Sequence, residues 1–429
     1  MALKKEKYYG RQTKLALTHF AIGEEKMPSG VLKAQAVIKK AAAKTNMRLG
    51  VLDAKRGRAI EKAAQEIIDG KFPNEFPLSL WMSGSGTQFN MNVNEVIASR
   101  ANQILTLRIN PSSPIHPNDH VNKSQSTNDT VPTAIHIAAV SAVEGGLLPV
   151  LSVLTQTLEK KSRSFRGIKK VGRTHLQDAV TLSLGQEFSG YTDQLRTASK
   201  RVLHATKGLY EVPIGGTAVG TGLNTPQGYR KKVIAEINRI TGLSMKPAHN
   251  LFAAMAAHDA LVTFSSSLEG LALSLMKIAN DIRWMGSGPN AGLGELLLPE
   301  NEPGSSIMPG KVNPTQCEAL MMVCARVIGN HAAVVHGSAG LSNFELQVAK
   351  PLLAHAILNS VRLLSDSTRS FERYGVRGIK ANAPRLKETA GSSLFEATKL
   401  SQDIGYDKAA EMVKMSRRAN FPKGHRKRR

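Results

Sequence analysis

The chain is 429 residues long and only 5% of them are aromatic, which favours several domains of helices packed through aliphatic side chains over a β-sandwich or barrel. Its net charge of +24 raises the question whether the protein binds nucleic acid. Most of the excess cations are dispersed, without the interleaved aromatic residues that proteins use to bind single strands, so nucleic acid is not the expected partner. With no run of eighteen apolar residues, no signal-peptide pattern and only two cysteines, the sequence predicts no membrane association and no disulfides, and it indicates the cytoplasm, with the mitochondrial matrix as the alternative.

The first 127 residues are expected to form an N-terminal domain of short helices. Their hydrophobic periodicity predicts two amphipathic helices separated by Gly50, the second of which ends at Gly70. The segment 83–94 that follows is crowded with small polar residues and leads into a helix through Glu95 and Ala101. Such a segment either forms a tight turn alone or offers hydroxyl groups to a ligand, and both alternatives stay open.

A second polar segment, 116–129, combines imidazole, amide and carboxylate side chains. The residues that could suggest a metal site are His116, Asn118 and Asp119. Their spacing is neither helical nor that of a zinc knuckle, so the segment predicts no metal site. The cluster 126–129 is expected to cap a long helix with Pro132 in its first turn. Side-chain donors and acceptors therefore gather again at a predicted helix start.

Residues 128–375 carry a series of long helical patterns and are expected to form a central domain. The predicted helices cover 132–163, with a bend near Gly145, then 184–210, 251–285, 314–335 and 346–373. In the third helix, apolar residues recur every three or four positions from Leu261 to Ile282, which calls for nearly parallel packing in a bundle. Helices of this length with apolar residues on more than one face would stay exposed in a monomer, so we expect an oligomer.

The loop 299–320 is the strongest candidate for chemistry. Its polar residues of interest are Ser305, Lys311, Asn313 and Glu318. The loop leads into a helix, whose unpaired N–H groups favour an anion, and Met308 within it is expected to be buried. A phosphate-binding loop requires four residues between its glycines and a Ser or Thr after its lysine. Here five residues separate the glycines and a valine follows the lysine, so nucleotide binding is rejected.

Two further segments carry weaker signals. Thr174 and His175 are expected in a polar loop just before the helix 184–210. A lone His in such a place is either a hydrogen-bonded cap or a catalytic group. The glycine-rich stretch 211–225 superficially resembles a dinucleotide-binding fingerprint. It follows a helix, however, and no βαβ unit surrounds it, so cofactor binding is not predicted.

Four polar segments next to long helices resemble the signature segments of the fumarase/aspartase superfamily: 83–94, 116–129, 172–178 and 304–318. GSSIMPGKVN matches the superfamily signature G-S-x-x-M-x-x-K-x-N at every position. The stretches GSGTQFNMNVNEVIASRA, HPNDHVNKSQSTNDT, GRTHLQDA, GGTAVGTGLN and GLGELLLPENEPGSS are most similar to class II fumarases. The resemblance covers about residues 8–375.

This resemblance implies an all-α fold of three domains with a central five-helix bundle. The implied domains are 1–127, 128–375 and a small, shortened C-terminal domain, 376–429, that ends in a basic tail. It also implies a homotetramer in which three subunits build each active site. The implied reaction is the reversible hydration of fumarate to L-malate without a metal or organic cofactor, so a small dicarboxylate is the expected ligand.

The resemblance also implies roles for individual residues. Ser305 is the base that removes a proton from carbon, and loop N–H groups must keep it as an alkoxide. Lys311 and Asn313 hold and polarise a substrate carboxylate. His175, paired with Glu318, handles water or hydroxide. The remaining substrate-binding residues are Ser85, Thr87, Ser126, Thr127, Asn128 and Thr174. A secondary dicarboxylate site corresponds to His116, Asn118 and Asp119.

Three positions depart from the usual fumarase pattern: Thr127 replaces a Ser, Asn290 replaces an Arg, and Phe89 is bulkier than usual and is expected to reshape the pocket. Thr127 is aspartase-like, whereas His175 stands where aspartases carry Gln, so fumarase activity is favoured over aspartate ammonia-lyase activity. A further hypothesis is a catalytically idle relative whose basic tail, 416–429, binds a polyanion. The presence of every predicted catalytic residue favours the enzyme.

Overall fold

The structure, a computed structural model, describes residues 6–391 and 401–419. Its contacts divide the chain into two compact units, each assembled from three stretches of sequence. Unit 1 contains Met1–Leu151, Ala198–Ser274 and Met322–Ser367, and unit 2 contains Ser152–Thr197, Leu275–Met321 and Thr368–Arg429. The boundaries fall within helices, so the long helices contribute residues to both units.

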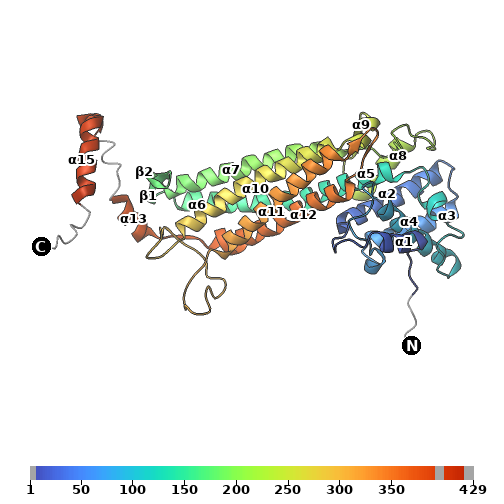
Figure 1. The fold of residues 1–429 in the computed structure, drawn as a ribbon, viewed down its shortest axis with the longest axis horizontal. Helices are drawn as coiled ribbons and strands as arrows, with labels where there is room; N and C mark the ends of the chain where they lie inside the picture. Colours follow the sequence, from blue (N-terminus) through green and yellow to red (C-terminus); the bar gives the residue numbers. More distant parts are fainter. Residues whose placement is uncertain (1–5, 392–400, 420–429) are drawn as a thin grey trace. The chain divides into compact units, whose positions relative to one another are not determined.

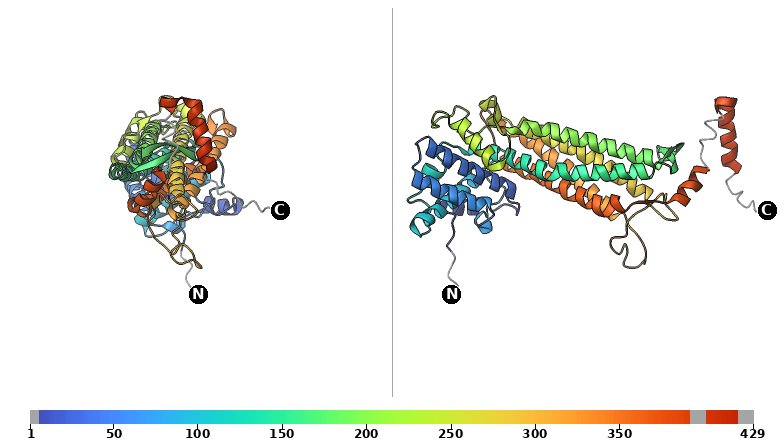
Figure 2. Two further views of the ribbon diagram at one scale, coloured as in Figure 1. Left: turned by 90° about the vertical axis from the view of Figure 1, so that its left-hand side faces the viewer. Right: turned by 180° about the vertical axis from the view of Figure 1, so that it is seen from behind.

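Five long helices form the predicted bundle. They are α6 (Leu148–Ser164), α7 (Leu184–Thr206), α10 (Asp259–Met285), α11 (Thr315–Gly340) and α12 (Lys350–Ser370). They run alongside one another in Figure 1 and Figure 2. Polar contacts join neighbouring helices: Tyr191 of α7 donates to Asp281 of α10 at 2.9 Å, and Asn330 of α11 donates to Ser360 of α12 at 3.0 Å. The predicted all-α bundle is confirmed.

The apolar stripe predicted on α10 faces the core. Its seven residues are each at most 1% exposed: Leu261, Phe264, Leu268, Leu271, Leu275, Ile278 and Ile282. Burying each such side chain stabilises the fold by about 1.5–3 kcal/mol. The bundle helices also expose large apolar side chains elsewhere, among them Trp284 and Met322. Within the described residues, 127–164, α10 and α11 are long and apolar enough to cross a membrane by length and composition. One chain therefore leaves much of the apolar surface of these helices uncovered.

Further helices of unit 1 lie outside this bundle. They are α1 (Arg11–His19), α2 (Ser29–Arg48), α3 (Ala54–Ile68), α4 (Thr87–Thr106), α5 (Thr127–Ala142), α8 (Tyr229–Thr241) and α9 (Leu251–Ala256). The pair predicted on either side of Gly50 is confirmed as α2 and α3, and Asp53 caps α3 by accepting from the Arg56 N–H at 3.0 Å. Short pieces complete the unit: η1 (Pro73–Glu75), η2 (Pro117–Val121), η4 (Lys207–Tyr210), the parallel strands β3 (Glu211–Val212) and β4 (Lys246–Pro247), and the antiparallel strands β6 (Ser342–Asn343) and β7 (Leu346–Gln347).

Two predicted helices differ from the structure. The helix expected over 251–285 is interrupted, because Ala257 is extended (φ −134°, ψ 158°) and separates α9 from α10. The helix expected to start at Pro132 starts at Thr127, because Ser126 and Asp129 form a capping box that satisfies its first N–H groups. The bend expected near Gly145 is a π-helical turn, η3 (Val143–Leu147).

The polar loop predicted around Thr174 and His175 is a β-hairpin. Strands β1 (Lys169–Thr174) and β2 (Gln177–Ser183) pair antiparallel, with Thr174 opposite Gln177. His175 and Leu176 form its two-residue turn, with φ values of 57° and 60°. Two consecutive positive φ values are those of a type I′ turn, which normally requires Asn and Gly. The prediction of a loop was therefore wrong, because these residues carry no hairpin signal of their own.

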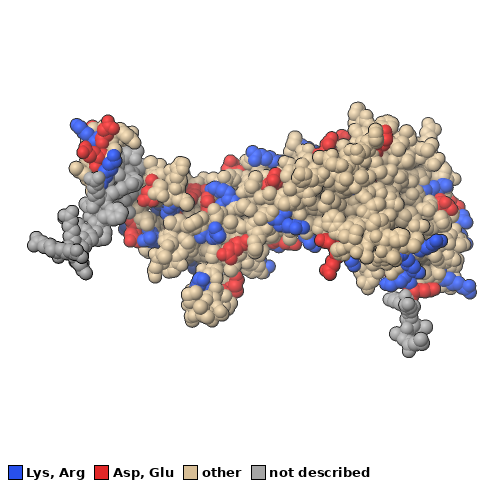
Figure 3. Space-filling model, in the orientation of Figure 1, with Lys and Arg blue, Asp and Glu red and all other residues tan. Residues whose placement is uncertain are grey.

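Unit 2 also contains short elements around the segments that follow α10 and α12. These are β5 (Leu296–Leu297), which pairs antiparallel with β8 (Lys380–Ala381), and η5 (Phe371–Gly375), η6 (Val376–Gly378), α13 (Ala383–Gly391) and α15 (Tyr406–Ala419). Cations and acids are interspersed on the face shown in Figure 3, as expected for a dispersed excess of charge. Most of the basic tail, 420–429, lies outside the described residues.

Candidate active site

The first polar segment places its hydroxyls at the start of α4. Ser85 Oγ and Thr87 Oγ1 lie 2.7 Å apart, and the Ser83 hydroxyl donates to Gln88 Oε1 at 2.6 Å. Gly86, with φ of 81°, turns the chain into the helix, a conformation that glycine adopts without strain. Two hydroxyls therefore stand together at a helix N-terminus, where unpaired N–H groups attract an anion.

A close backbone contact holds this segment in place. The Lys350 N–H donates to the Gly84 carbonyl oxygen at 2.9 Å, at the start of α12. A Cβ atom at Gly84 would lie 1.4 Å from the Val348 carbonyl oxygen, so no side chain fits there. The sequence left open whether this segment forms a tight turn alone or offers hydroxyl groups to a ligand. The structure resolves the role of the glycine: it permits close backbone packing, and this packing fixes the position of the neighbouring hydroxyls.

The second polar segment surrounds the start of α5. Ser126 caps the helix, and the Thr127 hydroxyl is nearly buried and accepts from Asn90 Nδ2 at 3.0 Å. Asn128 Nδ2 donates to the Ala218 carbonyl oxygen at 2.8 Å, which ties this segment to the glycine-rich stretch 211–225. His116 caps η2, where its Nδ1 accepts from two backbone N–H groups at 3.3 Å.

An open pocket of about 430 Å³ lies between these two stretches of unit 1. Asn118, Asp119 and Ser126 line one side, and Thr217 and Asn224 line the other. The predicted secondary-site residues Asn118 and Asp119 thus share one pocket with the predicted substrate-binding Ser126. The volume suits a small polar ligand.

Two buried charged residues support the pocket from inside and were not singled out from the sequence. Asp129 is fully buried and accepts from the backbone N–H groups of Ser126 at 2.9 Å and of Gly215 and Thr217 at 3.0 Å. Lys39 of α2 is also buried, and its Nζ donates to Asn122 at 2.9 Å and to Gln125 at 3.0 Å. Both sides of the pocket are therefore attached to Asp129, and Lys39 holds the chain just ahead of it.

Burial changes the acid–base behaviour of both groups. Desolvation raises the pKa of Asp129 to about 6, although three backbone N–H groups and the charge of Lys39 oppose the rise. Desolvation lowers the pKa of Lys39 to about 7, and the charge of Asp129 opposes that fall only in part. Such residues escape sequence reading because a lysine within an amphipathic helix normally faces solvent.

In unit 2, the hairpin tip presents His175 to solvent. His175 and Thr174 are exposed. His175 and Glu318 make no hydrogen bond or ion pair with each other among the residues described, and Glu318 is exposed in the first turn of α11. A single chain therefore does not bring the predicted pair together.

The loop 299–320 folds back on itself around Ser305. The Ser305 hydroxyl oxygen accepts from the backbone N–H of Met308 at 3.1 Å and of Ile307 at 3.3 Å. The side chain of Asn313 donates to the Gly304 carbonyl oxygen, which closes the loop. Lys311 is exposed, and Met308 is 48% exposed, so its predicted burial was wrong. The loop meets few core residues, and this leaves the methionine uncovered.

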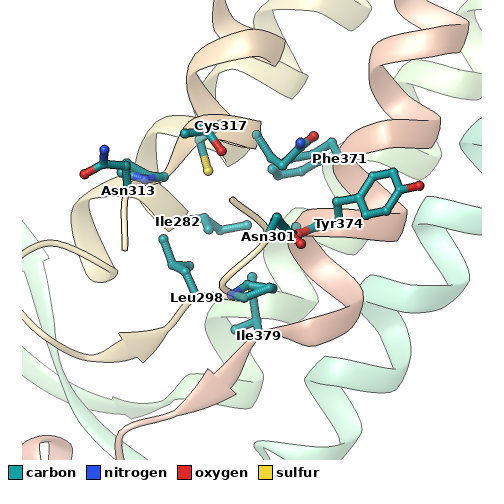
Figure 4. A pocket seen from close by; sticks show the side chains of 13 residues that line it. Ile282, Leu298, Asn301, Asn313, Cys317, Phe371, Tyr374 and Ile379 are labelled. Carbon is teal, nitrogen blue, oxygen red and sulfur yellow. The ribbon is translucent and has the colours of Figure 1, made fainter. Parts of the chain in front are cut away.

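A small pocket lies beneath the end of this loop (Figure 4). Asn313 and Cys317 line it together with Ile282, Leu298 and Phe371. Its volume of about 20 Å³ is that of a site for roughly one water molecule. It is too small for a dicarboxylate, and neither Ser305 nor Lys311 lines it.

Of the unusual residues, Phe89 is 3% exposed and lines neither of the two pockets described. Nothing in the described structure therefore supports its predicted effect on the pocket. Asn290 lies exposed in the loop after α10.

Comparison with known proteins agrees with this arrangement of segments. The family described as a lyase matches residues 1–329. The class II fumarate hydratase of Thermosynechococcus vestitus is 54% identical over 408 residues, which cover 95% of this chain and 87% of that protein. The chain belongs to the class II fumarate hydratase family. The predicted resemblance is thereby confirmed.

Other members of the family match over the same length. The mitochondrial fumarate hydratase of Homo sapiens is 54% identical over 411 residues, which cover 95% of this chain and 80% of that protein. The crystal structure of the class II fumarase of Schistosoma mansoni superposes with a TM-score of 0.93 at 42% identity, covering 96% of this chain and 89% of that one. This chain therefore resembles the members of the family both in sequence and in fold.

Replacing Gly84 by Ala tests the close contact behind Ser85. The new methyl group would force the segment 83–87 away from the backbone of Val348, which lies between β7 and α12, and overpacking of this kind costs about 1–3 kcal/mol. The melting temperature is expected to fall. Gly190→Ala in α7, where nothing lies within 4 Å of the new Cβ, is the control and should keep or slightly raise it, because alanine is the better helix former. Equal melting temperatures for both variants would contradict the close packing.

Replacing Lys39 by Met tests the buried ammonium group. Between pH 7 and about 10 the unfolded chain holds a proton that folded Lys39 has released, so this group makes stability rise with pH in that window. The melting temperature of Lys39→Met relative to the unmodified protein should be higher at pH 7 than at pH 10. Gln35→Met, a buried and non-titrating change on the same helix, should show no such difference. A pH-independent difference for Lys39→Met would contradict the lowered pKa.

Proposed function

We propose that this protein is a fumarate hydratase that catalyses the reversible, stereospecific hydration of fumarate to L-malate. The observation that carries the proposal is its 54% identity to curated fumarate hydratases over 95% of the chain. The reaction adds hydroxide to one alkene carbon and a proton to the other. In the reverse direction, a proton leaves a carbon beside a carboxylate, which is a very weak acid, and two negative charges gather on that carboxylate.

Ser305 acts as the base on carbon. A free serine hydroxyl is far too weak a base, so its alkoxide must be stabilised by donors already in place. The N–H groups of Ile307 and Met308 point at the Ser305 oxygen and can supply such stabilisation. Lys311 and Asn313, on the same loop, bind the carboxylate on which charge develops.

His175 acts on the other side of the substrate, where it gives a proton to the departing hydroxide or activates water. Glu318 is its partner in this step. Because the two residues make no hydrogen bond within the described part of one chain, we place the pair between subunits. Substrate carboxylates and the transferred hydroxyl are held by Ser85, Thr87, Ser126, Thr127, Asn128 and Thr174.

The pocket lined by Asn118 and Asp119 serves as a secondary dicarboxylate site, with His116 at its edge. Asp119 would repel a dianion, so binding there requires its neutralisation, and Lys123 in the same lining supplies a positive charge. No metal or organic cofactor takes part in the proposed reaction.

The active unit is a homotetramer with shared sites and the three-domain division 1–127, 128–375 and 376–429. The exposed apolar side chains of α10 and α11 support it, because one chain leaves them in water. We place the protein in the cytoplasm, with the mitochondrial matrix as the alternative, since the relatives include the enzyme of Thermosynechococcus vestitus and several named as mitochondrial.

Activity is tested by following fumarate absorbance in the ultraviolet. The unmodified protein should turn over fumarate, and Ser305→Ala and His175→Asn should each lower kcat by about 10²–10⁴-fold, the usual contribution of general acid–base groups. Ser306→Ala, the adjacent exposed hydroxyl, is the control and should keep near-normal activity. Turnover no greater than that of Ser305→Ala would contradict the enzyme function.

Two alternative functions can be distinguished from fumarate hydration by simple additions to that assay. Aspartate ammonia-lyase activity, which the aspartase-like Thr127 favours, would release ammonia from aspartate. A catalytically idle, polyanion-binding relative would show no turnover, and it would retain nucleic acid at about 0.2 M salt until the tail 416–429 is deleted.

Assembly is tested by changing the uncovered face of α11. Met322, 69% exposed in one chain, becomes buried if copies pack there. Met322→Glu should therefore yield smaller species in light scattering, and kcat should fall with them because each site draws on three subunits. Ile22→Glu, an exposed apolar residue outside the bundle, should keep the tetramer. A Met322→Glu protein with unchanged mass would contradict packing at this face.

A further inference from the structure

Glu295 is a fully buried carboxylate in unit 2 that the proposed reaction does not use. It ends the loop that follows α10, where its N–H donates to the Met285 carbonyl oxygen at 2.8 Å. Its side chain points at the hairpin that carries His175. A buried charge is costly unless partners surround it, so the contacts of Glu295 call for an explanation.

Two cations of strand β1 hold the carboxylate. Arg173 Nη2 donates to Glu295 Oε1 at 2.6 Å, and Lys170 Nζ lies 3.0 Å from Oε2, an ion pair without well-directed hydrogen-bond geometry. Lys170 is itself 1% exposed and also pairs with Glu187 at the start of α7. Two cations and two carboxylates thus balance within one buried cluster, which ties β1 to α7 and to the loop after α10.

The two cations lie on either side of an irregularity in the hairpin. The pairing of β1 with β2 shifts register between Val171 and Arg173, as at a β-bulge. Gly172 permits it, because a Cβ there would lie 2.8 Å from the Val180 carbonyl oxygen. A bulge redirects the strand that follows it, and here that strand ends two residues later at the His175 turn. By binding both sides of the bulge, Glu295 fixes where the hairpin tip points.

The backbone of the same residue leads to the second catalytic segment. The Glu295 carbonyl oxygen accepts from the Asn382 N–H at 2.9 Å. Directly after it, Leu296 and Leu297 form β5, paired with Ala381 and Lys380 of β8. From this short, fixed strand the chain enters the loop that contains Ser305. One residue therefore anchors the base of the His175 hairpin through its side chain and the base of the Ser305 loop through its backbone.

We propose that Glu295 is a positioning residue, which acts through Arg173 and Lys170 to hold the His175 hairpin in a fixed orientation on the loop that follows α10, and thereby sets where His175 enters the active site. The inference rests on the proposed function, since it concerns the groups that would perform the hydration. Misplacing a reacting group by about 1 Å can lower a rate by about 10²-fold, so a residue that touches no substrate can still control turnover.

The test compares Glu295→Gln with a matched control. Glu66 of α3 is the control residue, because it is also nearly buried and pairs with one arginine, Arg100, at 2.6 Å and one lysine, Lys71, at 3.7 Å. Glu295→Gln is expected to lower kcat by about 10–100-fold. KM should change by less than about threefold, because all the proposed carboxylate-binding groups except Thr174 lie outside the hairpin. Glu66→Gln should lower the melting temperature comparably and leave kcat within about twofold.

A second variant keeps the test decisive if Glu295→Gln does not fold. Arg173→Lys retains the charge of the cluster but loses the planar guanidinium that reaches Glu295, and it should lower kcat about tenfold in a normally folded tetramer. Unchanged kcat in a folded Glu295→Gln or Arg173→Lys protein overturns the inference, as does an equal loss of kcat in Glu66→Gln. An unmodified protein that does not hydrate fumarate would instead overturn the proposed function itself.

Discussion

The pocket of unit 1 depends on one buried carboxylate that receives backbone donors from two distant stretches of chain. Asp129 accepts from Ser126 at its own helix start and from Gly215 and Thr217 more than eighty residues later. Backbone N–H groups left unpaired in a protein interior are costly, so these contacts hold both walls of the pocket together. When protonated, Lys39 nearby offsets part of the charge of Asp129.

Buried acids also bind irregular segments at two other places in the chain. Glu95 of α4 is 3% exposed and accepts from the N–H groups of Gly10, Gln12 and Thr13, which caps the start of α1. Glu295 of unit 2 binds two cations of the hairpin in place of N–H groups. In each case an acid buried beside a helix or strand end positions an irregular segment that could not form a core of its own. Two of the four polar segments, 116–129 and 172–178, are thereby attached to the elements beside them.

The long helices are constrained differently, because their apolar surface is larger than one chain can bury. The inner stripe of α10 is buried, yet Leu273 on the same helix is 54% exposed and Met322 on α11 is 69% exposed. Among the described residues, three helical stretches are apolar enough to resemble membrane spans. The homotetramer proposed above would bury such surfaces, and it would bring the proposed catalytic segments that one chain keeps apart to a common site.

The sequence by itself determined the long helices, whose periodicity places α2, α3, α7, α11 and α12 within a few residues of their observed bounds, and it determined the family through contiguous motifs. Only the tertiary structure decided the hairpin that carries His175, the break at Ala257, the exposure of Met308 and the burial of Lys39. The reason is physical. A helix is specified by neighbours three and four residues apart, whereas the hairpin and the buried lysine depend on partners far along the chain, such as Glu295 for the hairpin and Asn122 for the lysine.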